Sequence, residues 1–509
     1  MNDDERLLAQ VRPEGWRNPE PAPLYDLVVI GGGTAGLVCA AGAAGLGARV
    51  AIIERSRLGG DCLNTGCVPS KALLRAARAV HDARRAASAG VAMTPRVDFA
   101  VAMESVRARR ADLAHHDSAQ RLASIGVHVF LGHASFAGPA RVIVGPAKAG
   151  PHDRAAGLHD SCKHCELKFR RAVIATGGRP AIPPIPGLSN LRYLTSENVF
   201  DLREQPRSLL VIGGGPIGCE LAQAFALLGT ATTLVETGPR LLPREDRDAG
   251  EIVTRRLTAD GVRVIAGASI RSISRSSGQI SAALDEQNVH VDAALVAVGR
   301  SPNTEGLNLD AAGVKRSDRG ITVDDRLQTS NRRIFSAGDV CSSYQFTHAA
   351  DAMARIVLQN ALFHGRRRAS ALVIPWATYT FPEVAHVGPT PDEAARLGAE
   401  ALTVPLADVD RAVIDAEPDG FLRIHHQRGR IVAATLVAPH AGELIGQVAS
   451  LMRRGGSLDE FSSDIFPYPT VADVLRKAGD AYRRTRLTPR ARAILARYFA
   501  VMRNLNRGP

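Results

Sequence analysis

Aromatic residues are scarce in this sequence, at 5% of the chain with only 2 Trp. Surfaces that bind nucleic acid combine clustered basic residues with aromatic ones, whereas the arginines here are dispersed. We therefore expect no nucleic-acid partner despite the net charge of +12. No run of about 18 apolar residues occurs, so no transmembrane helix is predicted. The N-terminus reads Met1-Asn2-Asp3-Asp4-Glu5, acidic where a secretory signal would be basic, which predicts a cytoplasmic protein.

Cysteine is also infrequent, with 7 in 509 residues. An odd, small number of cysteines in a long chain does not form the disulfide framework of a secreted protein, and a single reactive pair in a reducing compartment fits better. The chain exceeds the usual size of one hydrophobic core, and its 45% apolar content is ordinary for a globular protein. We therefore expect two or three domains.

One stretch, residues 59–71, carries both Cys62 and Cys67 and reads Gly-Gly-Asp-Cys-Leu-Asn-Thr-Gly-Cys-Val-Pro-Ser-Lys. Cysteines at this spacing can close a small disulfide ring, and the Ala/Leu/Arg-rich run that follows places the ring at a helix N-terminus. There the helix dipole and Lys71 would lower the pKa of a thiol and make its sulfur a nucleophile and electron carrier. Two buried structural cysteines are the simpler alternative.

A strand over residues 27–30 leads into a glycine-rich turn, a helix and a second strand that ends on Glu54. Gly31 would allow the tight turn, Gly33 would let a pyrophosphate approach the backbone, and Gly36 would permit close helix–strand packing. Glu54 would accept hydrogen bonds from ribose hydroxyls. The sequence therefore predicts a dinucleotide site here.

The same pattern recurs about 180 residues later, with a strand over 209–212, the glycines Gly213, Gly215 and Gly218, and an acid at Glu236. Two such units imply two dinucleotides in one chain, between which electrons pass. Glu236 would repel a 2′-phosphate and bind a free 2′-hydroxyl, which favours NADH over NADPH. Arg240 leaves NADPH open.

Residues 59–71 resemble the redox-active segment of the class I pyridine nucleotide-disulfide oxidoreductases, which include dihydrolipoamide dehydrogenase, glutathione reductase and mercuric reductase. The resemblance extends from about Tyr25 to Pro489. It implies an α/β fold with two Rossmann-like domains and a C-terminal α+β dimerisation domain, FAD as cofactor, and a homodimer whose subunits complete each other's active sites. By resemblance Cys67 lies against the flavin and Cys62 exchanges with the substrate.

Further residues take roles by the same resemblance. Glu220 would pair with Lys71 beside the flavin, and Asp339 would bind a ribityl hydroxyl. The helix that begins at Thr347 would face the flavin's pyrimidine edge, and the neighbouring His348 serves either there or in capping and packing. The chain would pass between the flavin and nicotinamide domains at Thr176 and Gly177, and again at Gly299.

These landmarks predict a domain order. We expect a flexible N-terminal arm, a discontinuous FAD domain, an NAD(P) domain, a dimerisation domain and a basic amphipathic C-terminal helix, over residues 1–22, 23–180 with 304–372, 181–303, 373–484 and 485–509. That last helix would dock onto its own dimer or, alternatively, touch an anionic membrane surface weakly.

One departure from the family bears on the substrate. Disulfide reductases of the family carry a His-Pro-Thr-x-x-Glu segment, whose His acts as acid and base, where this chain reads Tyr468-Pro469-Thr470-Val471-Ala472-Asp473. Tyrosine has a pKa of about 10 against about 6.5 for histidine, which disfavours reduction of lipoamide or glutathione. Mercuric reductases resemble the chain here. They also end in a cysteine pair, and many carry an N-terminal metal-binding cysteine domain, whereas this sequence ends Asn504-Leu505-Asn506-Arg507-Gly508-Pro509.

A second cysteine motif, Cys162-Lys163-His164-Cys165, suits a soft metal or another redox pair, but an exposed loop insertion over 145–168 is the favoured interpretation.

The predicted function is an FAD-dependent oxidoreductase that takes hydride from NAD(P)H and passes two electrons through FAD and the Cys62–Cys67 disulfide to a metal ion or small oxidant. The alternatives are a dihydrolipoamide dehydrogenase-like enzyme and a low-turnover flavin redox sensor.

Overall fold

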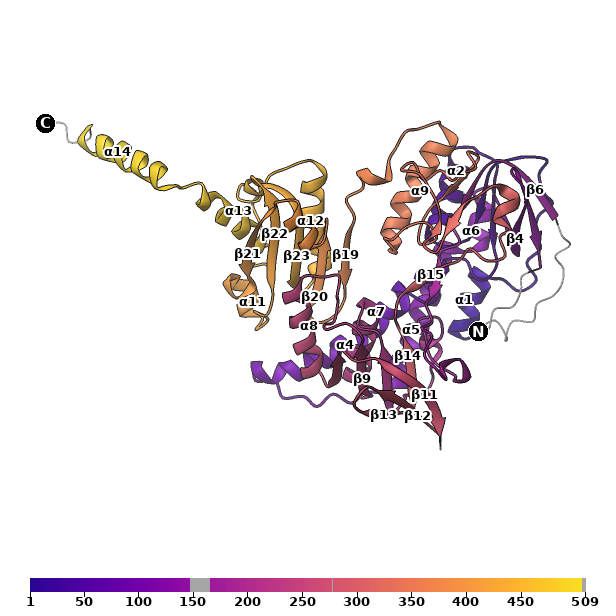
Figure 1. The fold of residues 1–509 in the computed structure, drawn as a ribbon, viewed down its shortest axis with the longest axis horizontal. Helices are drawn as coiled ribbons and strands as arrows, with labels where there is room; N and C mark the ends of the chain where they lie inside the picture. Colours follow the sequence, from indigo (N-terminus) through magenta and orange to yellow (C-terminus); the bar gives the residue numbers. More distant parts are fainter. Residues whose placement is uncertain (147–164, 277, 506–509) are drawn as a thin grey trace. The chain divides into compact units, whose positions relative to one another are not determined.

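The computed structural model describes residues 1–146, 165–276 and 278–505. The chain divides into two compact units, which can be followed by sequence colour in Figure 1: Met1–Pro239 with Leu257–Leu372, and Arg240–Arg256 with Val373–Pro509. The first unit contains both predicted dinucleotide-binding parts apart from residues 240–256, and the second contains the predicted dimerisation part.

The first unit is built around a sheet in which parallel strands follow the order β3-β2-β1-β6, with β18 also paired to β6. Its strands β1 and β2 are apolar and buried over nearly their whole length, as central parallel strands are. The antiparallel strands β5 and β4 extend the sheet from the first half of β6. These strands span β1 (Tyr25–Ile30), β2 (Val50–Glu54), β3 (Val127–Leu131), β4 (His133–Gly138), β5 (Arg141–Gly145), β6 (Cys165–Ile174) and β18 (Ile334–Ser336).

Helices α2 and α9 pack against each other beside this sheet (Figure 1), close enough that a Cβ on Gly42 would lie 2.6 Å from Leu358. The redox stretch forms the short helix α3 and the start of α4, and α4 packs against α5. The helices are α2 (Thr34–Gly45), α3 (Gly60–Asn64), α4 (Cys67–Arg85), α5 (Phe99–Leu113), α6 (Ala119–Ser124) and α9 (Thr347–Leu362).

A second parallel sheet in the same unit has the order β10-β9-β8-β14 and carries the second dinucleotide turn between β8 and α7. An antiparallel sheet, β11-β12-β13, lies next to it in sequence, and β7 pairs with β15 where the chain enters and leaves this part. The elements are β7 (Gly178–Pro180), β8 (Ser208–Ile212), α7 (Pro216–Leu227), β9 (Ala231–Glu236), β10 (Val262–Ala266), β11 (Ile270–Ser276), β12 (Gln279–Leu284), β13 (Asn288–Val291), β14 (Ala293–Val296) and β15 (Arg300–Pro302). Helix α8 (Arg247–Ala259) lies between β9 and β10 in the chain, and its residues up to Arg256 belong to the second unit.

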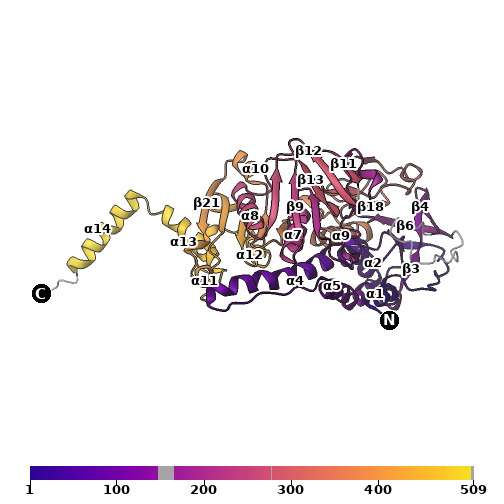
Figure 2. The ribbon, with the colours of Figure 1, turned by 90° about the horizontal axis from the view of Figure 1, so that it is seen from below.

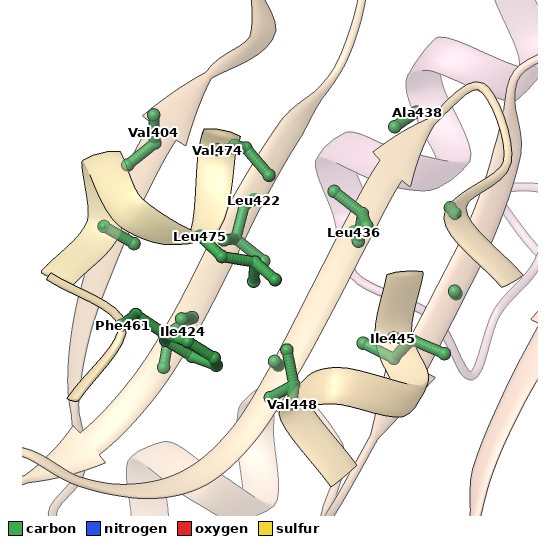
Figure 3. Packing of buried hydrophobic residues seen from close by; sticks show 14 of the residues in the cluster. Val404, Leu422, Ile424, Leu436, Ala438, Ile445, Val448, Phe461, Val474 and Leu475 are labelled. Atoms are coloured by element: carbon green, nitrogen blue, oxygen red, sulfur yellow. The ribbon is translucent and has the colours of Figure 1, made fainter. Parts of the chain in front are cut away.

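The second unit is an antiparallel sheet of order β19-β20-β23-β22-β21 with helices packed on it. Figure 3 shows Leu422 and Leu436 from the strands packed with Val448 of α12 and with Val474 and Leu475 of α13. The predicted α/β fold with a C-terminal α+β part is confirmed. The elements are β19 (Pro375–Thr378), β20 (Glu383–Val387), α10 (Pro391–Arg396), β21 (Glu400–Pro405), α11 (Asp410–Ile414), β22 (Phe421–Gln427), β23 (Arg430–Ala438), α12 (Ala441–Arg453) and α13 (Asp473–Thr485).

The N-terminal segment differs from the flexible arm expected over 1–22, because it contains helix α1 (Asp3–Val11). Asn2 caps this helix, and its apolar side chains Leu7 and Val11 are buried. Asp4 of α1 accepts a hydrogen bond at 3.2 Å from Arg110, a buried residue of α5, beside which α1 lies (Figure 2). Prolines at 13, 19, 21 and 23 suggested an unstructured arm, but they all follow the helix.

Two further boundaries differ from the sequence expectations. Strand β6 begins at Cys165, because alternate residues such as Leu167 and Phe169 are buried and their neighbours face solvent, so the loop expected over 145–168 ends earlier. Near the C-terminus, helix α14 (Pro489–Leu505) lies within the range of the helix expected over 485–509 but begins four residues later, after α13 ends at Thr485. Pro489 starts α14, where its missing N–H costs no hydrogen bond. No helix in the described residues is long and apolar enough to cross a membrane.

Candidate active site

The first dinucleotide turn joins β1 to α2 through glycines at which an added Cβ atom would collide with the neighbouring backbone. Gly31 has φ of +107°, and a Cβ there would clash with the carbonyl oxygen of Ala175. A Cβ on Gly36 would clash with the carbonyl oxygen of Gly31, and one on Gly60 would lie 2.6 Å from the Cα of Gly33. The result is a bare backbone cradle between the turn and the redox stretch.

Glu54 closes this turn. Its Oε2 accepts the N–H of Gly32 at 2.6 Å and its Oε1 accepts that of Ser56 at 2.6 Å. Burial raises the pKa of Glu54, while these two hydrogen bonds act to lower it. Among the described residues no side chain caps α2, so its first N–H groups stay available to an anion. The cradle, the helix N-terminus and the carboxylate together fit the diphosphate and ribose of FAD.

The second turn repeats this geometry between β8 and α7. Gly213 has φ of +110°, and a Cβ on Gly218 would clash with its carbonyl oxygen. Glu236 accepts the N–H of Gly214 through Oε2 at 2.6 Å, as Glu54 accepts that of Gly32. A Cβ on Gly215 would meet no atom of the described chain within 4 Å beyond its own neighbours, so this turn is open.

The two cysteines of the redox stretch come from neighbouring helices. Cys62 lies in α3, Cys67 begins α4, and both are free thiols in this structure. The Cys67 sulfur is 3.3 Å from the hydroxyl of Thr347, the first residue of α9. Three effects lower the pKa of Cys67 to about 6 although burial alone would raise it: the hydrogen bond from Cys62, the hydrogen bond from Thr347 and the charge of Lys71. The hydrogen bond to Cys67 and burial raise the pKa of Cys62. At neutral pH the reduced pair therefore holds its negative charge on Cys67.

Lys71 and Glu220 form the ion pair that was predicted, with Nζ 2.8 Å from Oε2. Lys71 lies one turn after Cys67 on α4, and Glu220 lies on α7 just after the second glycine turn. The Glu220 side chain is only 6% exposed, whereas Lys71 is 38% exposed. Lys71 lowers the pKa of Cys67 and Glu220 raises it. The pair thus links the redox helix to the second dinucleotide turn.

Arg300 is a site residue that sequence reasoning missed. Its Nε donates to Asp339 at 3.1 Å, and its Nη2 donates to Asp61, next to Cys62, and to the carbonyl of Gly178 at 2.9 Å. Burial raises the pKa of Asp339, and the charge of Arg300 opposes that rise. Arg300 follows Gly299 and Asp61 precedes Cys62, so both residues lie next to recognised motifs. Nothing in the sequence, however, indicates that the two contact each other.

The crossing segments lie beside one another, as the resemblance implied. The hydroxyl of Thr176 donates to the carbonyl of Asn303 at 2.6 Å, and the Asn303 side chain donates back to the carbonyl of Thr176 at 3.0 Å. Gly177 and Gly299 both have positive φ there. Near the start of α9, His348 stacks on Phe346 with ring centroids 5.5 Å apart, which supports its packing role.

In the second unit, Tyr468 is 72% exposed, and its hydroxyl donates to Asp410 at 2.8 Å. This hydrogen bond, more than any other effect, raises the pKa of Tyr468. Asp473, at the position of the family glutamate, is held instead by Arg476 at 2.7 Å and lies 3.7 Å from Lys477. Asp410 was not foreseen, because it lies 58 positions away from Tyr468 in the chain.

Of the second cysteine motif, Cys162, Lys163 and His164 lie outside the described residues, and Cys165 begins β6. Within 1–146, 165–276 and 278–505, no group of three or more His, Cys, Asp and Glu side chains is arranged to hold a metal ion.

Two dinucleotide turns and a thiol pair of unequal pKa beside a Lys–Glu ion pair are the features of a flavoprotein disulfide reductase. The sequence matches the model of the pyridine nucleotide-disulphide oxidoreductases over residues 25–354 and the model of their dimerisation domain over 374–478. The chain therefore belongs to the pyridine nucleotide-disulphide oxidoreductase family, whose members bind FAD and NAD(P)H.

Individual relatives agree with this assignment. A mercuric reductase of Acidithiobacillus ferrooxidans is 34% identical, covering 93% of this chain and 85% of its own length. A dihydrolipoyl dehydrogenase of Chlamydia muridarum is 32% identical, covering 88% of this chain and 95% of its own. The HOCl-induced flavoprotein disulfide reductase RclA of Escherichia coli, solved as a Cu(II) complex, has a TM-score of 0.79 at 28% identity, covering 90% of this chain and 100% of that one.

Proposed function

We propose that this enzyme passes two electrons from NAD(P)H through the Cys62–Cys67 disulfide to a metal ion or a small oxidant. The observation that carries the proposal is the thiol pair, in which Cys67 has a pKa of about 6 and the pKa of Cys62 is raised. When bound, FAD accepts hydride from NAD(P)H and supplies the two electrons that open the disulfide.

The chain's own residues divide the remaining work. Cys67 keeps the negative charge, stabilised by the Thr347 hydroxyl at 3.3 Å and by Lys71. Cys62 stays protonated until an acceptor arrives. It then loses its proton and attacks or ligates the acceptor as a thiolate. When the acceptor has taken two electrons, the pair has released the one proton that it held, on Cys62, and closes to the disulfide again. Glu220 holds Lys71 in place for this cycle.

The nicotinamide dinucleotide would lie at Gly213, Gly215 and Gly218, with its ribose on Glu236. A carboxylate at that position disfavours a 2′-phosphate. Arg240, the group that would favour NADPH, already donates to the backbone carbonyls of Leu242, Pro243 and Glu245. Both observations support NADH.

Tyr468 supports an acceptor other than a disulfide. Its phenol has a raised pKa and an aspartate acceptor, so it cannot exchange protons near neutral pH as a histidine does. In a homodimer, for which the dimerisation domain argues, the partner subunit's Tyr468 would steer the acceptor at Cys62. The relatives named mercuric reductase, and the Cu(II) complex of the RclA structure, make a thiophilic metal ion the favoured acceptor.

The test is steady-state NADH and NADPH oxidation by the purified protein with Hg(II), Cu(II), lipoamide and glutathione disulfide as separate acceptors. We expect turnover with a metal ion, and its loss in Cys62→Ser with FAD content unchanged. Rapid lipoamide reduction by the wild type, not increased by Tyr468→His, would favour a dihydrolipoamide dehydrogenase. No acceptor-dependent rate at all would favour a redox sensor.

A further inference from the structure

The C-terminal helix α14 carries apolar side chains that the described part of its own chain leaves exposed. Ile494 is 68% exposed, Tyr498 56% and Phe499 54%. These residues recur with helical spacing, since Ile494, Tyr498 and Met502 form one row and Leu495 and Phe499 form the row beside it. The helix therefore presents one continuous apolar face.

Arginines border this face on both edges. Arg490 and Arg497 are seven positions apart and lie along one edge, while Arg492 and Arg503 are eleven apart and lie along the other. In the part of the chain that the structure describes, none of the four forms an ion pair, whereas Arg486, just before the helix, lies 3.5 Å from Asp459. Long arginine side chains at the edges of an apolar face can extend to the level of lipid phosphates.

The charge around this apolar face favours a phospholipid surface over a second copy of the chain as its binding partner. Residues 481–509 contain 8 Arg and neither Asp nor Glu. A second copy of this chain carries the same net charge of +12 and offers no net counter-charge, whereas anionic phospholipids do. We propose that α14 lies on an anionic phospholipid surface, with its apolar face between the headgroups and its arginines on the phosphates. The helix is not long and apolar enough to span the bilayer, so it lies along the surface.

The full-length protein tests this by co-sedimentation with vesicles. We expect binding to phosphatidylcholine vesicles that contain phosphatidylglycerol and about tenfold weaker binding to pure phosphatidylcholine. Raising the salt from about 0.1 M to about 1 M shortens the Debye length from about 10 Å to about 3 Å and should release most of the protein. Equal binding to both vesicle types, or none to either, would overturn the proposal.

Two matched double variants distinguish insertion of the apolar face between the headgroups from purely electrostatic attraction to the vesicle. Leu495→Glu with Phe499→Glu places two carboxylates on the apolar face, whereas Ala496→Glu with Ala500→Glu makes the same charge change on the opposite face. The first should abolish vesicle binding, and the second should reduce it by about tenfold or less. Unchanged FAD content and NADH oxidation in both would show that the fold is intact. If the first variant instead changes the oligomeric state and leaves vesicle binding intact, a second copy covers α14 and the proposal is wrong.

Discussion

The two dinucleotide turns have the same backbone design but different surroundings. Both carry a glycine with φ near +110° and an acid that accepts a backbone N–H at 2.6 Å. Glu54 is buried, and Gly33 faces the redox stretch at Gly60. Glu236 is half-buried, and a Cβ on Gly215 would have no described atom within 4 Å apart from its own neighbours. An enclosed turn suits a cofactor that stays bound, and an open one suits a cofactor that exchanges in each cycle.

The largest effects are expected when the equivalent glycine of each turn is replaced by alanine. In Gly36→Ala and Gly218→Ala, the new Cβ clashes with a turn carbonyl. Each clash should lower the free energy of unfolding by about 1–3 kcal/mol. We expect Gly36→Ala to be purified with little or no FAD. Gly218→Ala should be yellow, with near-stoichiometric FAD, but poorly reduced by NADH. The flavin absorbance per polypeptide and the extent of anaerobic reduction measure both effects. FAD loss in Gly218→Ala alone would reverse the assignment of the turns.

The Lys71–Glu220 pair, which links the redox helix to the second turn, should give shifts of opposite sign in the pKa of Cys67 when either partner is neutralised. Lys71 lowers the pKa of Cys67, so Lys71→Met should raise it and slow alkylation of Cys67 by about fivefold near pH 6. Glu220 raises the pKa of Cys67, so Glu220→Gln should lower it and speed alkylation at the same pH. Mass spectrometry of the Cys67 peptide after iodoacetamide treatment measures both rates. Shifts of the same sign would show that the pair acts through structure and not through charge.

The acids at the two turns should control different properties. Glu236→Gln removes the charge that disfavours a 2′-phosphate and should raise kcat/KM for NADPH relative to NADH by about tenfold, or about 1.4 kcal/mol. Glu54→Gln should leave that ratio unchanged and weaken FAD retention. Kinetics with both nicotinamides, compared with the FAD content of each variant, distinguish these outcomes. An unchanged ratio in Glu236→Gln would remove the reason for favouring NADH.

The smallest changes concern the glycines that face the ligands. A Cβ on Gly33 would lie 3.6 Å from Gly60, an ordinary contact, and one on Gly215 would contact none of the residues that the structure describes. Neither substitution should alter the free energy of unfolding by more than about 0.5 kcal/mol. Gly33→Ala should weaken FAD binding and Gly215→Ala should raise KM for NADH, each by about tenfold, because a methyl group would block the pyrophosphate. Thermal unfolding and ligand titration measure the two quantities separately.

Local patterns predicted much of this molecule. The glycine turns, the acids at Glu54 and Glu236, and the cysteine stretch could be identified because each lies within one short segment with its own steric requirement. The Lys71–Glu220 pair came from the family resemblance and not from spacing. The Arg300 contacts with Asp61 and Asp339, and the hydrogen bond from Tyr468 to Asp410, join segments far apart in the chain, and no local pattern indicates them.

The N-terminus shows another limit of pattern reading. Several prolines suggested a flexible arm, yet the nine residues of α1 precede them and bury two apolar side chains. The contact of α1 with Arg110 depends on where α5 lies in the folded chain, which composition does not reveal.

The central claim is that Cys67 carries the thiolate charge in the reduced enzyme. Its direct test is anaerobic titration with NADH at several pH values, with the long-wavelength charge-transfer absorbance between a thiolate and the bound flavin as the signal. Because a lowered pKa keeps the thiolate above about pH 6 and loses it below, the band should appear with a midpoint near pH 6 and be absent in Cys67→Ser. A band of undiminished intensity in Cys67→Ser would contradict the account.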